Sequence, residues 1–401
     1  MKKLNKLCAI LFAVLGVTTL KAQTNIIADW DGGSNTGKPT TFGWVSSYGS
    51  RNWGELNGSG GARVTNSYSG YKKEDGNTYS YVADSEPSTQ ILWIRYNSTS
   101  ETYTYTFEGL EAGKVYRFTG LVGWHNNSNA PTFTIRVNGD KELAKVTKYC
   151  SARQTMYPFS VGFMVPADNQ SENFTLTFNS NQADDNMEAL SALSIVENTD
   201  VENATEASPY DMTSWLKNPG FENGSSSTNA VNAPTDWKVT YDLAGWLDGN
   251  PNTTNPSEGT KCYNLWAGTV NCIDIYQTLY LPAGKDRVSA DLRTDFVNNI
   301  TNQGVYANVG GVITKSGTIQ TVASPTWNSL EGWNTLTATF NNGSAGEVTI
   351  GISSTGNGGS SGWFQVDNVR LEYLGFDLTE ANEALNDLIT LAQEKIGANQ
   401  A

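Results

Sequence analysis

The sequence predicts an all-β protein, with two tandem jelly-roll β-sandwiches followed by a short C-terminal helix. Two observations lead to this prediction. Short runs that alternate apolar and polar residues recur along the chain, and Gly, Asn and Pro separate them, as expected for half-buried strands joined by turns. Apolar residues at helical spacing are nearly absent before residue 377.

Residues 1–22 have the composition of a secretion signal. Three lysines lie among the first six residues, and the apolar run over residues 7–20 is too short to span a bilayer. We expect cleavage near Ala22 and a mature protein that is secreted, periplasmic or located on the cell surface of a bacterium.

The composition is acidic, with a formal net charge of −14. Removal of the signal, which contains lysines but no acidic residue, makes the charge more negative. Binding to nucleic acid or to an anionic membrane requires a basic patch, so the charge argues against both kinds of partner.

The first sandwich is expected over residues 24–199 and the second over residues 210–375, and each is long enough to bury its own core. Residues 200–209 between them are polar, which predicts a linker. The two halves share one design, since an aromatic residue followed by an acid stands near the start of each. The alternating runs of the first half cover residues 103–107, 115–122, 132–137, 159–165, 174–178 and 190–196.

An amphipathic helix is predicted over residues 377–399. Residues 377–380 resemble a capping box, and an apolar stripe follows at helical spacing. Either this helix covers the second sandwich or it begins a further region of a longer protein, and we favour the second alternative. The stripe consists of Leu385, Leu388, Ile389, Ala392 and Ile396.

Glu222 and Asp367 stand in the segments that open and close the second half, and the first and last strands of a sandwich often lie side by side. Their carboxylates can then hold one hard cation such as Ca²⁺, with turn carbonyls as further ligands. The alternative is that both are surface turn residues. In the first half, Asp31 with Asp185 or Glu188 is the analogous metal-binding pair.

Three cysteines follow the signal. Cys262 and Cys272 flank nine residues that can turn back on themselves, so they are the candidate disulfide pair of an exported protein. Cys150 is expected to be unpaired and buried. None of the spacings matches a zinc site.

Several motifs of the second half occur in an order known from other proteins. Residues 218–222 read Asn-Pro-Gly-Phe-Glu, and further strand motifs cover residues 257–265, 275–279, 289–293, 332–340 and 366–371. Over residues 218–373 the chain resembles jelly-roll carbohydrate-binding modules of the family 4, 9 and 22 type. The resemblance covers less than half of the chain, and the first half is similar to the same fold only loosely.

This resemblance implies a galactose-binding-like sandwich, a structural calcium ion, and a polysaccharide or oligosaccharide as ligand. It also implies an association with a glycan-degrading enzyme, either as a further domain of the same chain or as a partner protein. One departure weakens the calcium expectation: the family commonly has two consecutive aspartates near the end, whereas this chain has Asp367-Asn368.

Strand alternation selects candidate sugar-binding side chains, because residues that alternate with core positions point away from the core. Aromatic rings suit the C–H faces of a sugar, and polar groups suit its hydroxyls. The predicted concave face carries Trp266, Tyr306, Arg293, Asp295, Asn264 and Asn308, with Trp246 and Trp327 at its ends and Trp124 as the candidate of the first half. Core filling, the usual role of tryptophan, is assigned to Trp30, Trp237, Trp333 and Trp363.

Two other function classes remain open. The chain lacks the Glu-x-Asp-x-x-Glu pattern of jelly-roll glucanases, no Gly-x-Ser-x-Gly elbow precedes a helix, and His125 is the single histidine. We therefore expect no catalytic centre, although a polysaccharide lyase that uses His125 with Tyr and Arg is an alternative. The other alternative is an adhesive or spacer protein whose sandwiches bind protein partners.

Overall fold

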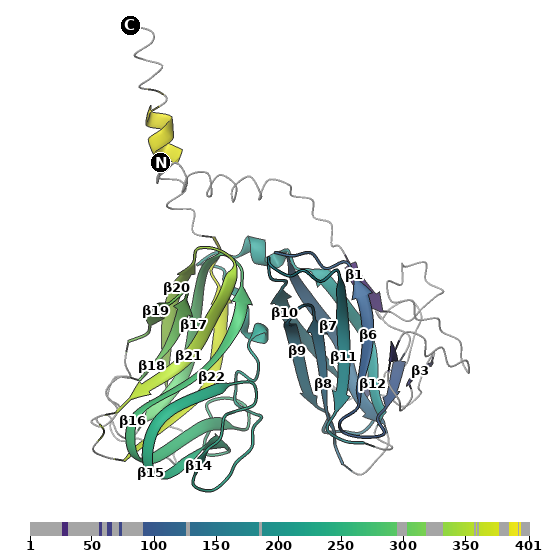
Figure 1. Cartoon of the computed structure of the whole chain (residues 1–401), viewed down its shortest axis with the longest axis horizontal. Helices are drawn as coiled ribbons and strands as arrows, with labels where there is room; N and C mark the ends of the chain where they lie inside the picture. Colours follow the sequence, from purple (N-terminus) through teal and green to yellow (C-terminus); the bar gives the residue numbers. More distant parts are fainter. Residues whose placement is uncertain are drawn as a thin grey trace.

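The structure is a computed structural model, and it confirms the all-β class, with two β-sandwiches in tandem and a short helix near the C-terminus (Figure 1). The residues described are 26–30, 56–57, 62–65, 72–73, 91–125, 129–183, 187–294, 303–317, 332–356, 358, 361–376, 385–391 and 393. The predicted signal at residues 1–22 lies outside them. No helix among the described residues has the length and apolar character to cross a membrane.

Two facing sheets make up the first sandwich. The larger sheet contains β1 (Ile26–Trp30), β3 (Ala62–Thr65), β4 (Lys72–Lys73), β5 (Ile91–Arg95), β7 (Val115–His125), β10 (Thr155–Met164) and β12 (Met187–Glu197). Its order is β3-β5-β12-β7-β10-β4, and β1 also pairs with β12. The smaller sheet contains β2 (Leu56–Asn57), β6 (Thr102–Glu108), β8 (Thr132–Asn138), β9 (Glu142–Tyr149) and β11 (Asn173–Ser180), in the order β2-β6-β11-β8-β9.

The core of this sandwich forms because alternate residues of each strand face the opposite sheet. Strands β8 and β11 alternate buried and partly exposed residues along their whole length. Phe133 and Phe178 from the smaller sheet and Phe118 and Ile195 from the larger one are fully buried in a single cluster.

A single curved sheet folds over itself to form the second sandwich. Its strands are β13 (Tyr210–Asp211), β14 (Ala230–Val231), β15 (Lys238–Asn252), β16 (Cys262–Leu281), β17 (Gly284–Thr294), β18 (Gly304–Val309), β19 (Val312–Lys315), β20 (Asn334–Asn342), β21 (Gly346–Thr355) and β22 (Gly362–Tyr373). The order is β19-β18-β21-β16-β22-β17-β20, with β15 along the other side of β16, β14 beside β15, and β13 beside β22.

Strand β16 belongs to both layers of this sandwich. Its first part pairs with β22 and its last part with β21, while β15 accompanies it on the other side. The pair bends where Gly245, with a positive φ of 79°, packs against Gly268, and a Cβ at Gly245 would lie 3.2 Å from the Gly268 Cα. Leu265 before the bend and Ile275 after it are buried in the same core cluster, so the core lies between the two layers.

The opening segment of the second half is held by its aromatic residue. Phe221 is completely buried, with its ring centroid 5.0 Å from that of Trp237 and 6.1 Å from that of Tyr263. The Trp237 Nε1 donates a hydrogen bond to the Asn218 carbonyl at 2.9 Å. Trp237 therefore has the core position that the sequence predicted.

Residues 200–209, predicted as a polar linker, are packed into the structure instead. They contain the 3-10 helix η1 (Asp200–Asn203), from which Val201 is buried, and Ala204 follows it into the core of the second sandwich. Met164, the last residue of β10 in the first sandwich, belongs to the same cluster. The sequence did not predict these contacts, because the segment is mostly polar and only Val201 and Ala204 reach the core.

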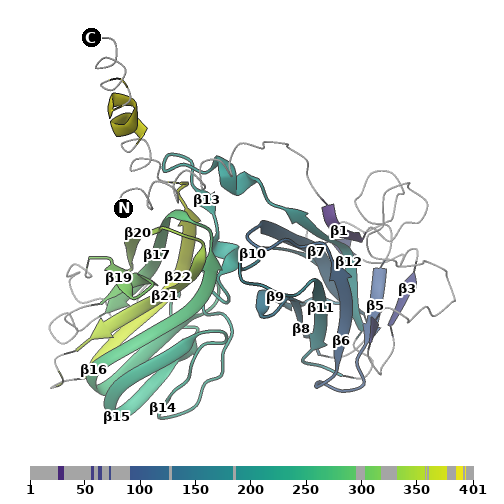
Figure 2. The same cartoon turned by 45° about the horizontal axis from the view of Figure 1, so that its top comes forward.

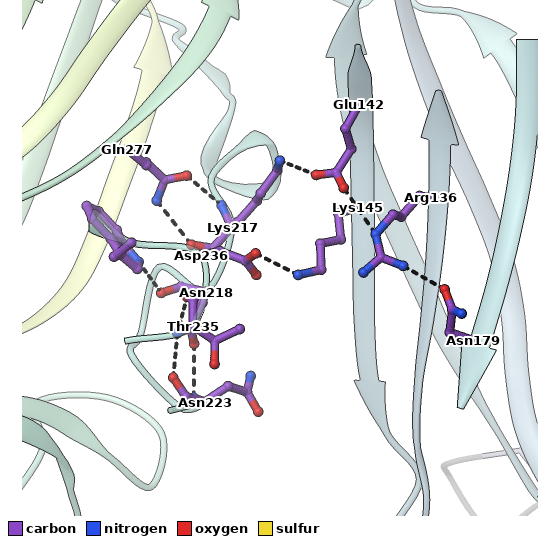
Figure 3. A network of polar contacts seen from close by, with 11 residues as sticks. Arg136, Glu142, Lys145, Asn179, Lys217, Asn218, Asn223, Thr235, Asp236 and Gln277 are labelled. Carbon is purple, nitrogen blue, oxygen red and sulfur yellow. Dashed lines mark hydrogen bonds and ion pairs between the residues drawn. The ribbon is translucent and has the colours of Figure 1, made fainter. Parts of the chain in front are cut away.

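One tryptophan joins the two sandwiches directly. Trp215 ends the 3-10 helix η2 (Thr213–Trp215), and its indole lies on Gly162 of β10, where a Cβ would collide with the indole nitrogen. Around this contact, ion pairs cross the boundary between Lys145 and Asp236, at 2.6 Å, and between Lys217 and Glu142 (Figure 3). The sandwiches are therefore docked against each other through specific side chains.

A helical stretch at residues 385–391 agrees with the predicted C-terminal helix. It projects away from both sandwiches in two views (Figures 1 and 2). Leu385, Leu388 and Ile389, which belong to the predicted apolar stripe, are exposed.

Two carboxylates are completely buried in the sandwich cores. Glu188 of β12 accepts a hydrogen bond from the Tyr96 hydroxyl at 2.5 Å, and burial raises the pKa of Glu188 to about 8. It faces the core and not a cation, so the metal role suggested for it is wrong; Asp31 and Asp185 lie outside the described residues. Neither oxygen of Asp286 in β17 has a hydrogen-bond partner among the described residues, and burial raises its pKa to about 8.

Replacement of Gly162 by Ala is expected to weaken the docking of the sandwiches, because the added methyl group displaces the Trp215 indole. Overpacking of this kind costs about 1–3 kcal/mol. We expect a lower unfolding temperature and a larger radius of gyration in X-ray scattering. Gly343→Ala is the control, since nothing lies within 4 Å of a Cβ there. Equal behaviour of both variants would contradict the docking described.

The free energy of unfolding is expected to fall as the pH rises between about 5 and 8. Glu188 and Asp286 have folded pKa values near 8, above their ordinary values of 4.5 and 3.8, so in this window the folded protein binds more protons than the unfolded chain. Thermal unfolding across the window measures this. The double variant Glu188→Gln, Asp286→Asn should show a weaker pH dependence, while the exposed Glu108→Gln should not; an unchanged slope in the double variant would disprove the assignment.

Candidate functional site

Four tryptophans lie across the outer face of one layer of the second sandwich, which we call the indole face. Trp266 of β16 pairs directly with Trp363 of β22. One row further along, Asn264 pairs with Gln365, which in turn pairs with Arg293 of β17. The indole face is defined as Trp246, Asn264, Trp266, Arg293, Trp333, Trp363 and Gln365.

Strand alternation explains why these residues face outward. Leu265, Phe364 and Leu292 occupy the intervening positions of the three strands, and all three are buried in the core of the second sandwich. Trp333, directly before β20, continues the row, because the next residue, Asn334, pairs with Leu292. The face therefore follows from where the core residues lie.

Arg293 lies at the centre of the face and is 0% exposed. Its guanidinium carbon is 4.6 Å from the centroid of the Trp333 ring and 5.5 Å from that of Trp363. Its Nε donates to the Gln365 Oε1 at 2.6 Å. Burial lowers the pKa of Arg293, and the aromatic faces and amide oxygen around it offset part of the cost of burial. Arg293 is thus a positioning residue that fixes two indole rings.

The same polar group holds a loop against the face. The Arg293 Nη2 donates to the carbonyls of Thr254 and Asn255, at 3.4 and 3.2 Å. The Gln365 Nε2 donates to the Thr254 carbonyl at 3.1 Å, and the Trp333 Nε1 to the Asn255 carbonyl at 3.3 Å. The loop is therefore anchored by side chains of the face itself.

Two indoles of the face remain accessible. Trp246, in the bend of β15, is 54% exposed, and Trp266 is half-buried. Trp363 is buried, and its Nε1 donates to the Asn264 Oδ1 at 2.8 Å. The face therefore presents exposed ring surface at Trp246 and Trp266, while the guanidinium of Arg293 and the amides of Asn264 and Gln365 are buried beside these rings.

The expectation that Tyr306 and Asn308 share this face is wrong. Both belong to β18, in the other layer, where Val305 and Ala307 point into the core. The Tyr306 ring lies over Gly351, and its hydroxyl donates to the Asp274 Oδ2 at 2.9 Å. Since the core separates the layers, alternation selected outward residues correctly but did not identify the layer to which each strand belongs.

Other predicted site residues have different outcomes. Trp124 is buried in the first core, because β7 continues to His125 and no loop begins before it, so its predicted binding role is wrong. Asp295 and Trp327 lie outside the described residues. The sequence missed Gln365, although Phe364 and Val366, which take the inward positions of β22, place it on the outer side. Trp363 is buried, as expected, whereas Trp333, also expected in the core, is half-buried.

Glu222 and Asp367 converge on one place. A Cβ at Gly220 would lie 3.9 Å from both the Glu222 Oε1 and the Asp367 Oδ1. The loop over residues 257–261 wraps the pair. The Glu222 Oε1 accepts hydrogen bonds from the backbone N–H groups of Thr260 and Lys261, at 2.7 and 3.2 Å. The Asp367 Oδ2 accepts from the N–H groups of Ser257 and Glu258, at 2.8 and 2.9 Å.

Glu222 and Asp367 are the candidate ligands of the expected calcium ion. Asp367 is completely buried, and burial raises its pKa to about 6 although several hydrogen bonds stabilise its charge. The groups that surround the two carboxylates are backbone N–H and hydroxyl donors, and Ca²⁺, which takes six to eight oxygen ligands, would need backbone carbonyls or water in addition. Clusters of three or more His, Cys, Asp or Glu side chains able to hold a metal are absent from the described residues, so backbone oxygens would have to complete the shell.

The predicted disulfide between Cys262 and Cys272 is wrong, because both cysteines are free. They lie on the single strand β16, whose residues are spaced by about 3.3 Å, so ten positions separate them by roughly 30 Å. The intervening residues extend and do not turn back. Cys150 forms no disulfide and is buried, as expected, with its Sγ 4.0 Å from the Val122 carbonyl.

No protein-family model matches the chain, and no curated protein matches it. Among solved structures, the chain is similar to TmCBM61 in complex with β-1,4-galactotriose, with 22% identity, a TM-score of 0.29, and coverage of 39% of this chain and 95% of that one. It is similar to the tandem CBM22-1-CBM22-2 domain of Xyn10C from Paenibacillus barcinonensis, with 11% identity, a TM-score of 0.28, and coverage of 88% and 99%.

A cyclase from Fischerella sp. TAU is similar as well, with 17% identity, a TM-score of 0.32, and coverage of 39% of this chain and 94% of that one. These structures thus include carbohydrate-binding modules and an enzyme. All three TM-scores are below 0.5 and all identities below 25%, so the fold and function assigned to this chain rest on its own strand pairing and side chains.

Proposed function

We propose that this protein is an exported, non-catalytic carbohydrate-binding protein that holds a polysaccharide or oligosaccharide on the indole face. The observation that supports this most directly is the accessible ring surface of Trp246 and Trp266 beside a fixed polar row. Aromatic rings are rigid, amphipathic contact surfaces, and they suit sugar rings, which have apolar C–H faces and a hydroxyl rim.

Each part of the face has a separate task in this proposal. The two accessible indoles stack on sugar rings. The buried amides of Asn264 and Gln365 act from beneath the surface by fixing Trp363 and Arg293, and Arg293 in turn holds the rings of Trp333 and Trp363 in place. Because the polar groups are already oriented by hydrogen bonds, little conformational freedom is lost when a ligand binds.

The chemistry of the face favours binding over catalysis. Its charged group, Arg293, is completely buried and engaged with Gln365 and the loop carbonyls, so it is not placed to exchange a proton with a ligand. A glycan-degrading enzyme, as a further domain or as a partner, is the proposed source of catalytic activity.

Calcium is proposed as a structural ion held by Glu222 and Asp367. An ion at this place would link the opening segment of the second half to the closing strand β22, with Ca²⁺ supplying the positive charge that offsets the two carboxylates. Its proposed role is to stabilise the fold near the loop over residues 257–261, on which both carboxylates already depend.

Truncation of the accessible indoles is expected to weaken glycan binding. Stacking of a ring on a flat ligand contributes about 1–3 kcal/mol on nucleobases and somewhat less on sugars, so Trp246→Ala and Trp266→Ala should each reduce affinity by roughly fivefold or more. Affinity-gel electrophoresis with plant, microbial and host polysaccharides measures this on the full chain. Tyr149→Ala, which removes a ring that is 58% exposed on β9, is the matched control. Retardation by none of the polymers would contradict the proposed function.

Removal of calcium is expected to lower the unfolding temperature. An ion that binds only the folded state stabilises it by about 2.7 kcal/mol at a concentration 100 times its Kd. Thermal unfolding with calcium and with EGTA should therefore differ for the unmodified protein and for Glu258→Gln, an exposed carboxylate of the same loop, but not for Glu222→Gln. Identical curves for the unmodified protein in both buffers would rule out the ion.

A further inference from the structure

We propose that the groove between the two sandwiches is a second oligosaccharide-binding site, separate from the indole face. The groove has a volume of about 740 Å³ and is lined by residues of both sandwiches. Clefts of roughly 300–1,000 Å³ are typical of small-molecule sites, and such sites occur preferentially at domain boundaries. The groove shares no residue with the indole face.

The first wall of the groove consists of two edge strands. Strand β9 ends the smaller sheet, and β10 pairs with the short β4 only at Thr155 and Met156. The next residues of β10, Pro158 to Ser160, line the groove and offer backbone polar groups along an edge that is unpaired among the described strands. Thr147 of β9 adds a hydroxyl.

An aromatic platform lies in this wall. Phe159 is half-buried and lines the groove. Its ring packs on Phe118 with centroids 5.1 Å apart and planes at 67°, and a Cβ at Gly120 would lie 2.7 Å from its ring. The core thus fixes the ring from behind, which leaves its groove-facing surface for an apolar ligand face.

The opposite wall of the groove, on the second sandwich, contains residues with hydroxyl and amide side chains. It comes from the segment that opens the second sandwich and includes Thr213, Ser214, Asn218 and Thr235. The Asn218 amide is engaged with Asn223 and Thr235, whereas the hydroxyls of Thr213 and Ser214 accept hydrogen bonds from backbone N–H groups and keep their own hydrogens to donate. One apolar surface beside uncharged hydroxyls is the chemistry that recognises a sugar. A peptide or lipid would instead require a longer apolar track.

Charges in the groove are nearly balanced. Lys145 and Asp236 form a 2.6 Å ion pair across it, with side chains only 12% and 19% exposed (Figure 3). The remaining charged residues of the lining include both signs, namely Lys148, Lys217, Asp211, Glu222 and Glu258. The groove therefore has no excess of positive charge to hold a polyanion, so we assign it a neutral oligosaccharide.

The groove is formed before any ligand arrives. Trp215 on Gly162 and the ion pairs of Lys145 and Lys217 hold the two walls at their separation. A site with fixed walls loses less conformational entropy on binding than one that has to close. The choice of a sugar as ligand rests on the proposed function of the protein, whereas the existence of the site rests on the groove itself.

The test uses the full chain and two variants that add an indole to each of the two edge strands of the first wall, Ser160→Trp in β10 and Thr147→Trp in β9. Ser100→Trp, on an exposed loop outside the groove, is the matched control. Isothermal titration with β-1,4-galactotriose, xylohexaose, cellohexaose and mannohexaose measures affinity and stoichiometry. We expect two sites in the unmodified protein, and loss of one site, with at least tenfold weaker binding there, in both groove variants.

The outcomes separate this proposal from the indole face. If Trp266→Ala removes one site and the groove variants the other, both proposals hold. If the groove variants titrate like the unmodified protein while Trp266→Ala abolishes binding, the groove proposal is overturned and the proposed function stands. If only the groove variants lose binding, the groove proposal holds and the indole face is wrong. Unfolding temperatures confirm that each variant is folded, and absence of binding by any probe to the unmodified protein overturns the groove proposal.

Discussion

The second sandwich depends on the strand β16, which is 20 residues long and pairs with β15, β21 and β22. Because this strand runs through both layers, it brings β22 in one layer and β21 in the other onto the same core. Its inward side chains must therefore meet that core both before and after the bend. Leu265 meets that requirement before the bend and Ile275 after it. Before the bend, the outward residue Trp266 of β16 belongs to the indole face. After the bend, Asp274 of β16 accepts the hydrogen bond of Tyr306 from β18, on the other side of the core.

Alternation and turn residues were sufficient to predict the class of the fold, the two sandwiches and the outward direction of Trp266 and Asn264. The prediction that Trp266, Arg293 and Tyr306 share one concave face was wrong for a physical reason. Whether Tyr306 and Arg293 share a layer depends on long-range pairing, and nothing local to either strand encodes it. The predicted disulfide was wrong for a related reason: the nine residues between the cysteines were expected to turn back, whereas their pairing with β15 keeps them in one continuous strand.

The roles of the tryptophans also depend on pairing. Trp237 was assigned correctly because it stands next to the aromatic opening segment that needs a core partner. Trp363 is buried as expected, but on the outer side of its layer, because Phe364 and Val366 take the inward positions of β22. Arg293, expected to meet ligand hydroxyls, is enclosed by indoles and carbonyls and acts through them. The convergence of Glu222 and Asp367, in contrast, follows from the proximity of first and last strands.

The packed segment over residues 200–209 has a consequence for how far the two sandwiches can be separated. Val201 and Ala204 belong to the core of the second sandwich together with Met164, which is contributed by the first. Removal of the second half would expose Met164 of the first sandwich to solvent, and removal of the first half would expose the apolar residues of the second core that pack on it. The two sandwiches therefore share part of one interior, and we expect either half produced alone to be less stable than the intact tandem.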